Sequence, residues 1–131
     1  MRITVALLKE LNACSGGIDK FEKFLNGRKY VLPTQRNLQL AAEHTAASDY
    51  VPWLVAKLKL TCVLDFGLGE KHWYQCGLLH REGGPAVIYP NGVRKWYLNG
   101  RLHRDDGPAV IYFNGLQLWY RDGRYVCSDR P

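Results

Sequence analysis

The two halves of this chain differ in how their apolar residues are spaced. In residues 1–59 apolar residues recur every three or four positions, which is the period of an amphipathic helix. From residue 60 onward, short apolar runs alternate with turns that contain glycine, which is the pattern of β-hairpins. The sequence therefore predicts an α+β protein, with a small helical module over residues 1–59 and an elongated antiparallel sheet of hairpin repeats over residues 60–131.

The first part of the helical module predicts two helices. Ser15 is expected to cap the second of them, because its hydroxyl can accept a hydrogen bond from a free backbone N–H group. Asn26-Gly27 is expected to end that helix, since both residues tolerate the left-handed conformation. The apolar residues of the two helices are Val5, Ala6, Leu7, Leu8, Leu11, Ile18, Phe21, Phe24 and Leu25.

Two more helices are predicted before residue 60. Thr34 follows Pro33 and is a suitable cap for a third helix, and Ser48 or Asp49 can start a fourth. Pro52 fits only in the first turn of that fourth helix, where its missing N–H costs no hydrogen bond. The apolar residues of these helices are Leu38, Ala41, Ala42, Trp53, Leu54 and Leu58.

The second half of the chain contains an internal repeat. The segment HREGGPAVIY, which begins at His80, returns as HRDDGPAVIY, which begins at His103. Three Trp-Tyr pairs, which begin at Trp73, Trp96 and Trp119, give a period of 23 residues. Such a period indicates a stack of repeated units, each of which buries its apolar surface against its neighbours.

Each repeat is predicted to be a β-hairpin. Asn91-Gly92 between apolar runs favours a two-residue type I′ loop, because both residues tolerate positive φ. This loop would pair Val87 with Trp96 and Tyr89 with Arg94 on one face of the sheet. The opposite face would carry Ala86, Ile88, Lys95 and Tyr97. The same register in the other copies pairs Leu64 with Trp73, Phe66 with Lys71, Val110 with Trp119, and Tyr112 with Gln117.

The sheet is expected to display two aromatic stripes. A second tight turn is predicted at Asn99-Gly100, and the segment 105–108 would then lead the chain into the next repeat. Neighbouring Trp and Tyr residues point to opposite faces of a strand, so one stripe is of Trp and the other of Tyr. The stripe that stays uncovered is the predicted binding surface. Its candidate partner-binding residues are Trp73, Trp96, Tyr97, Trp119, Tyr120, Arg94, Lys95, Arg81 and Arg104.

The motif His-Arg-Asp-x-Gly-Pro-Ala, followed by a strand and then by Asn-Gly-x-x-x-Trp-Tyr, resembles the MORN-repeat family in its bacterial and phage variant. The resemblance covers about residues 62–127. It departs from the pattern at both ends, where the run from Cys62 to Phe66 replaces Pro-Ala-Val-Ile-Tyr, and Tyr125-Val126-Cys127 stands where Leu-His-Arg is expected. Terminal repeats are often atypical because they cap the stack. The resemblance implies an interaction scaffold and no conserved chemistry.

The helical module has a resemblance of its own. The run from Leu7 to Cys14, together with Gly17, Phe21 and Trp53-Leu54, is similar to a short helical domain common in phage and prophage proteins. This resemblance implies that the chain is encoded by a bacterial virus or an integrated element. Small proteins of that kind often serve as accessories or as inhibitors of host defence, and they would act in the host bacterial cytoplasm.

Composition agrees with one folded unit that stays out of the membrane. The 131 residues are 47% hydrophobic, which is ample for one core, yet no apolar stretch is long enough to span a bilayer. The segment 1–10 lacks the apolar core and cleavage site of a signal peptide, so cytoplasmic residence is expected. The four cysteines are widely spread, and we expect reduced thiols that are mostly buried.

The net charge of +6 is divided unequally between the two halves. Residues 1–59 hold nine Lys and Arg against five Asp and Glu, whereas residues 60–131 hold nine against seven. Seven of the nine cations in the second half are Arg. Arg beside aromatic residues suits interfaces and cation–π contacts, so the repeats are the predicted binding half.

The repeated His-Arg pairs are the first candidates for chemistry. His80-Arg81 and His103-Arg104 could bind phosphate or act as an acid/base pair. Their repetition favours a structural role instead, because an active site needs one asymmetric set of groups. The other elements of a protein-kinase catalytic site are absent from the sequence, which rules out that reading of His-Arg-Asp.

A metal site is the second candidate for chemistry. Cys76 and His80, with His103 or Cys127, could supply metal ligands, but their spacing matches no strong zinc pattern. We therefore assign no catalytic residue, no cofactor and no metal, and we expect that the protein is not an enzyme.

These observations predict non-catalytic binding to a bacterial protein or ribonucleoprotein complex. The resemblances favour a phage-encoded inhibitor of a defence complex, of the anti-CRISPR type, that acts by occlusion. One alternative is a toxin-neutralising immunity protein. Another is a nucleic-acid-binding accessory, since Arg and aromatic residues can stack on bases. No membrane association is expected, whereas the open edges of a repeat sheet would permit a dimer.

Overall fold

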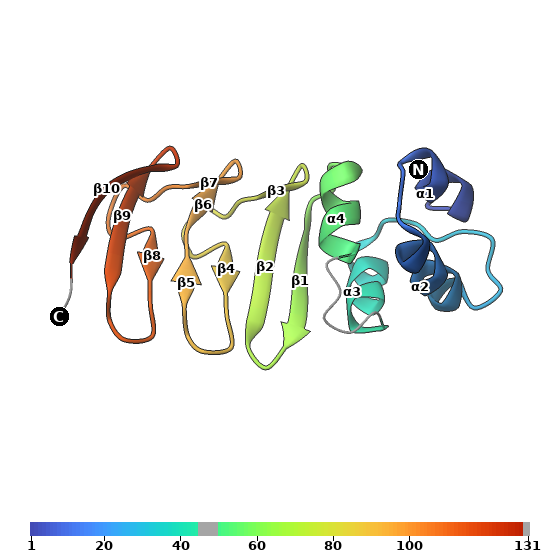
Figure 1. Ribbon diagram of the computed structural model, residues 1–131, viewed down its shortest axis with the longest axis horizontal. Helices are drawn as coiled ribbons and strands as arrows, with labels where there is room; N and C mark the ends of the chain where they lie inside the picture. Colours follow the sequence, from blue (N-terminus) through green and yellow to red (C-terminus); the bar gives the residue numbers. More distant parts are fainter. Residues whose placement is uncertain (45–49, 130–131) are drawn as a thin grey trace.

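The computed structural model describes residues 1–44 and 50–129 of the chain. The described helices lie at one end, and the hairpins follow in a row toward the other end (Figure 1). The molecule is therefore elongated, and the predicted α+β class is confirmed. The helices are α1 (Val5–Glu10), α2 (Ser15–Leu25), α3 (Gln35–His44) and α4 (Tyr50–Lys57).

The helix boundaries agree with the predicted caps at two positions and correct one. Asn26 ends α2 in the left-handed conformation, and the Thr34 hydroxyl accepts a hydrogen bond from the Asn37 N–H (3.2 Å) at the start of α3. The predicted cap at Ser15 is wrong by one residue, because the Cys14 thiol takes that place and accepts from the Gly17 N–H (3.4 Å). Pro52 lies in the first turn of α4, as predicted, whereas Ser48 and Asp49 fall outside the described residues.

The strands form an antiparallel sheet that grows by one hairpin at a time. Its order is β1-β2-β4-β5-β8-β9-β10, with β3 beside β2, while β6 and β7 form a separate small hairpin. The hairpins β1–β2, β4–β5 and β8–β9 are the three repeats along the row (Figure 1). The strand bounds are β1 Cys62–Gly67, β2 Glu70–Gln75, β3 Leu78–Leu79, β4 Val87–Ile88, β5 Arg94–Lys95, β6 Tyr97–Leu98, β7 Arg101–Leu102, β8 Val110–Ile111, β9 Gln117–Arg121 and β10 Arg124–Asp129.

The predicted register of the hairpins is wrong by one residue. Val87 pairs with Lys95 and not with Trp96, because the loop has three residues instead of two. The Gly92 N–H donates to the Tyr89 carbonyl (3.0 Å), and the Tyr89 N–H donates to the Val93 carbonyl (2.9 Å). These bonds define a type I turn followed by Gly92 at φ 86°, in place of the expected type I′ turn.

The same correction applies to the other two repeats. Leu64 pairs with His72 instead of Trp73, and Val110 pairs with Leu118 instead of Trp119. The first hairpin has a shorter turn, and an irregularity at Phe66 then shifts its strands into the same register as in the other repeats. Phe66 therefore does not pair with Lys71. The remaining predicted pairs, Tyr89 with Arg94 and Tyr112 with Gln117, are replaced by Ile88 with Arg94 and Ile111 with Gln117. The second tight turn at Asn99-Gly100 is confirmed, with Leu98 paired to Arg101.

The observed register assigns the aromatic residues to two faces of the sheet. The Trp face carries the three tryptophans of the repeats, which are Trp73, Trp96 and Trp119, with Ala86, Ile88 and Arg94 beside them. The Tyr face carries Tyr74, Tyr89, Tyr97, Tyr112 and Tyr120, with His72, Val87 and Lys95 between them. Val87 and Tyr89 therefore lie on the same face as Lys95 and Tyr97, whereas the prediction placed them on the opposite face.

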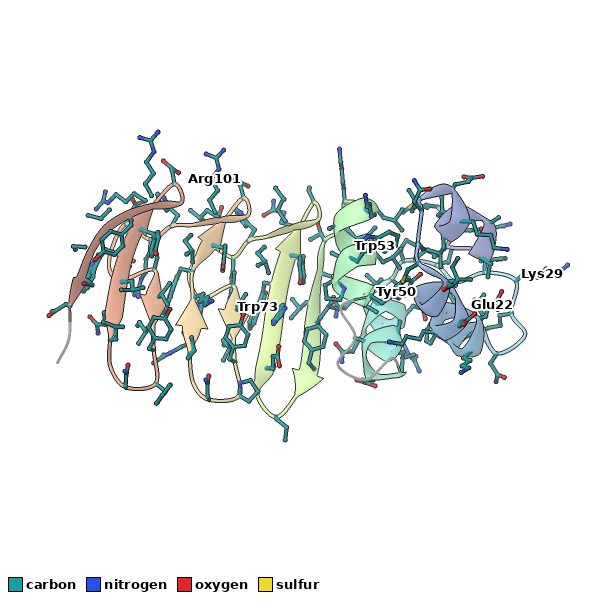
Figure 2. The ribbon with its side chains drawn as sticks, viewed as in Figure 1. Glu22, Lys29, Tyr50, Trp53, Trp73 and Arg101 are labelled. Atoms are coloured by element: carbon teal, nitrogen blue, oxygen red, sulfur yellow. The ribbon has the colours of Figure 1, made fainter. Side chains whose placement is uncertain are left out.

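The main core lies between the helices and the first hairpin. Leu8, Val51 and Val55 of the helices are fully buried, and so is Leu64 of β1. Tyr50 and Trp53 of α4 stack on one another within this region (Figure 2), with ring centroids 5.7 Å apart. The helical module therefore shares one core with the first repeat and closes that end of the stack.

Candidate functional site

The arginine of each His-Arg pair packs on a tryptophan of the Trp face. The Arg81 guanidinium carbon lies 4.0 Å from the centre of the Trp73 ring, and Arg81 Nη1 donates to the Pro85 carbonyl (3.1 Å). The next repeat places Arg104 over Trp96 at 4.1 Å, with the equivalent bond to Pro108 (3.1 Å). The segments that connect the hairpins therefore run over the Trp face and cover part of it.

The glycine before each proline makes room for this packing. A Cβ atom at Gly84 would lie 2.9 Å from the guanidinium carbon of Arg81, and a Cβ at Gly107 would lie 2.9 Å from that of Arg104. Each guanidinium is therefore held between an indole ring and a glycine backbone. This contact explains why Gly-Pro follows His-Arg at the same distance in both copies.

The histidines of the same pairs brace the turn of the following repeat. His80 Nδ1 accepts a hydrogen bond from the Asn99 backbone N–H (3.0 Å), and His103 Nδ1 accepts one from the Asp122 N–H (3.0 Å). An Nδ1 atom that accepts from a backbone N–H belongs to a neutral imidazole with its proton on Nε2. The geometry agrees with the structural role that the sequence favours for these pairs.

The last repeat lacks this arrangement. Cys127 stands where the arginine would be, and it pairs with Trp119 across the two strands. The chain therefore does not turn onto the Trp face after Asp122-Gly123 but continues beside β9 as the edge strand β10. The substitution of Tyr-Val-Cys for Leu-His-Arg thus exchanges a covering loop for an edge strand.

The Tyr face holds a cluster of tyrosines that belong to different repeats. Burial raises the pKa of Tyr97, and the neighbouring hydroxyls of Tyr89, Tyr112 and Tyr120 raise it further. Tyr120 also meets Tyr125 of β10 edge-on, with ring centroids 5.7 Å apart. These partly or fully exposed rings extend over the second and third repeats and reach β10.

His72 joins the first hairpin to this cluster. Its ring lies 4.9 Å from that of Phe66 and 6.1 Å from that of Tyr89, and its Nε2 atom is 3.0 Å from Glu70 Oε1. Burial lowers the pKa of His72, and Glu70 offsets part of this effect. The imidazole is therefore mainly neutral near pH 7 and extends the aromatic surface of the Tyr face.

The Tyr face is nearly neutral. Among the described residues that the register places on it, Glu70 and Lys95 carry full charges, and Lys95 lies over the Tyr89 ring at 5.4 Å. The Trp face, by contrast, carries Arg81, Arg94 and Arg104, together with acidic residues of the connecting segments. A groove of about 350 Å³ lies between two of these segments, above Trp96 and Leu98.

The structure divides the predicted binding residues into two groups. Lys95, Tyr97 and Tyr120 lie on the Tyr face. Trp73, Trp96, Trp119, Arg81, Arg94 and Arg104 lie on the Trp face, where two of the tryptophans are covered by arginines. The prediction missed Tyr89, Tyr112 and His72 on the Tyr face. The recurrence of Phe66, Tyr89 and Tyr112 at intervals of 23 residues is the signal that could have identified this row.

The cysteines correct a further prediction. All four are free thiols, but Cys14, Cys76 and Cys127 are exposed, and only Cys62 is buried among them. Burial raises the pKa of the Cys62 thiol to about 11. Across residues 1–44 and 50–129, no three His, Cys, Asp or Glu side chains gather in a way that could hold a metal ion.

The fold and the two faces define the protein by class, as an α+β protein built on hairpin repeats. Comparison of the chain with known protein families, curated proteins and solved structures finds no match. Within the part of the chain that the structure describes, no helix has the length and apolar character needed to cross a membrane.

Proposed function

We propose that this protein is a non-catalytic binding protein whose Tyr face docks onto another protein. The observation that carries the proposal is the row of tyrosines on the face opposite the connecting segments. Tyrosine gives a large and rigid contact area at a low entropic cost, and it is enriched in protein interfaces. The tryptophans are the weaker candidates, because Trp73 and Trp96 already pack against arginines of their own chain.

The charge of the Tyr face favours a protein over a nucleic acid. Nucleic-acid binding requires several cations to neutralise phosphates, and it depends strongly on salt. On this face Lys95 is accompanied by Glu70, so the two charges cancel. Tyrosines alone could stack on bases, but without a cationic track the backbone would not be held.

The repeated contacts support a role without catalysis. His80 and His103 each accept a backbone hydrogen bond, and each of their arginines is held between an indole ring and a glycine. Two equal copies of such a group give no asymmetric set of nucleophile, base and oxyanion donor. These side chains therefore serve the stacking of the repeats.

The setting that we propose is inhibition of a bacterial defence complex by a phage-encoded protein, which would act by occlusion. This setting rests on the resemblance of the helical module and the repeats to phage proteins. The alternative is an immunity protein that neutralises a toxin, which would use the same face on a different target. The identity of the bound protein separates the two.

Affinity capture from a bacterial lysate tests the proposal. The lysate is treated with nuclease, the tagged protein is washed at moderate salt, and bound proteins are identified by mass spectrometry. The wild type should retain a stoichiometric protein, and the Tyr97→Ala/Tyr120→Ala double variant should retain about tenfold less, since loss of central aromatic contacts costs more than 1 kcal/mol each.

The matched control is Arg94→Ala/Arg121→Ala, which changes two exposed residues of the Trp face. This variant should retain as much of the partner as the wild type. Circular dichroism of every variant confirms that it is folded. Retention of nucleic acid without any protein, or equal loss of the partner in both double variants, would contradict the proposal.

A further inference from the structure

One edge of the sheet is closed by the helical module. Gln35 and Gln39 lie one turn apart on α3, and each side-chain amide bonds both backbone groups of one residue of β1. Gln39 Oε1 accepts from the Asp65 N–H (2.8 Å), and Gln39 Nε2 donates to the Asp65 carbonyl (2.7 Å). Gln35 makes the same pair of bonds to Val63. The two amides thus take the place of a neighbouring strand.

The opposite edge of the sheet is open. All residues of β10 are exposed, including Tyr125 at 56% and Val126 at 53%. The outermost position of β10 is visible at the far end of the row (Figure 1). An exposed edge strand is a template for pairing with another strand, because its outward N–H and C=O groups lack partners within the sheet.

The outward backbone groups of β10 are those of Tyr125 and Ser128. The residues that lie opposite them on β9 are Tyr120 and Leu118. The carbonyls of these two residues accept hydrogen bonds from the Arg104 and Ala109 N–H groups, on the side of β9 that faces away from β10. In an antiparallel ladder such residues form non-hydrogen-bonded pairs, so Tyr125 and Ser128 direct their own groups away from β9. Because of the irregularity between Tyr125 and Cys127, Tyr125 and Ser128 are three positions apart, although their neighbours on β9 are two positions apart.

We propose that two copies of the protein pair through β10 in an antiparallel and two-fold symmetric manner. Tyr125 of each copy lies opposite Ser128 of the other, and the backbone groups of both residues are satisfied. The arrangement is self-complementary, as a closed dimer requires. The same register sets Arg124 opposite Asp129 of the second copy, so that unlike charges meet at both ends of the paired strands.

Two further features favour a dimer as the assembly. The Tyr120–Tyr125 contact carries the Tyr face to the edge, so pairing at β10 joins the Tyr faces of the two copies into one surface. Growth beyond two copies is blocked because Gln35 and Gln39 occupy the β1 edge. This proposal does not depend on the proposed function of the Tyr face.

Sedimentation velocity over a range of protein concentrations tests the dimer. The wild type should shift from one chain to two as the concentration rises. Arg124→Asp and Asp129→Arg should each weaken dimerisation by on the order of tenfold, because each brings like charges together twice in the dimer. The combined variant Arg124→Asp/Asp129→Arg restores both unlike pairs and should dimerise as the wild type does.

Arg101→Asp is the matched control. Arg101 occupies the position of Arg124 one repeat earlier and belongs to the β6–β7 hairpin, not to the edge strand β10 (Figure 2). The Arg101→Asp variant should dimerise as strongly as the wild type. A protein that stays a single chain at the highest concentration overturns the proposal. A dimer that is as strong in Arg124→Asp and in Asp129→Arg as in the wild type also overturns it.

Discussion

Single residues at equivalent positions of the repeats make the same contacts. Arg81 and Arg104 share their distances to an indole ring and to a proline carbonyl, although their acidic neighbours differ. The side chains therefore hold each connecting segment on the Trp face through local contacts that are repeated along the stack. The stability of the repeats should depend on these contacts.

Arg104→Ala should destabilise the protein by about 1–3 kcal/mol, because it removes a cation–π contact and a hydrogen bond. Gly107→Ala should have a similar effect, since its Cβ would displace the guanidinium of Arg104. Urea unfolding of both variants and of the double variant measures these changes. The double variant should lose clearly less than the sum of the two, because both changes remove one contact.

The control for this cycle is Gly16→Ala in α2, where a Cβ would meet nothing within 4 Å. This variant should be at least as stable as the wild type, because alanine has the higher helix propensity. Strict additivity of Arg104→Ala and Gly107→Ala would show that the guanidinium does not depend on the glycine.

At the scale of elements, the same dipeptide forms two kinds of turn. Asn99-Gly100 makes a two-residue turn in which both residues have positive φ, whereas Asn91-Gly92 belongs to a three-residue loop. Side-chain contacts distinguish the two. In the three-residue loop the Asn91 side chain accepts a hydrogen bond from the Val93 N–H (3.1 Å), as Asn114 does from Leu116, whereas the Asn99 N–H donates to His80 Nδ1 (3.0 Å). The prediction considered Asn-Gly alone and therefore placed the registers of the β4–β5 and β8–β9 hairpins one residue away from the observed ones, whereas in the β1–β2 hairpin the difference arises at the irregularity near Phe66.

Phe113→Pro should stabilise the protein by about 0.4–1 kcal/mol, because proline restricts the unfolded chain at a position whose conformation it can adopt. Phe113 occupies in the third hairpin the place of Pro90 in the second, and it is 75% exposed. Thermal unfolding followed by circular dichroism measures the change. A lower midpoint than that of the wild type would show that the two loops differ.

The order of the elements was easier to predict than their contacts. Helical spacing and the 23-residue period were sufficient for the α+β class and the row of hairpins, because both are set by local pattern. The closing of β1 by Gln35 and Gln39 could not be predicted, since these residues are distant in sequence from Val63 and Asp65. The thiol cap at Cys14 was missed because serine is the commoner cap.

At the scale of the whole molecule, the two faces of the sheet differ in how far the chain itself covers them. The connecting segments hold the repeats together on the Trp face, and the helical module closes one end. The sequence predicted two aromatic stripes but not which one the chain would cover, because that depends on the path of the segments after His80 and His103. The Trp face is partly covered by the connecting segments, and we therefore propose the Tyr face as the docking side.

Hydroxyl-radical footprinting of the protein with and without its captured partner tests this claim most directly. Oxidation of Tyr97, Tyr112 and Tyr120 should fall when the partner binds, because the interface excludes solvent from the Tyr face. Oxidation of Trp73 and Trp96 should remain unchanged, since they lie on the other side under Arg81 and Arg104. Protection of the tryptophans with unchanged oxidation of the tyrosines would contradict the claim and place the partner on the Trp face.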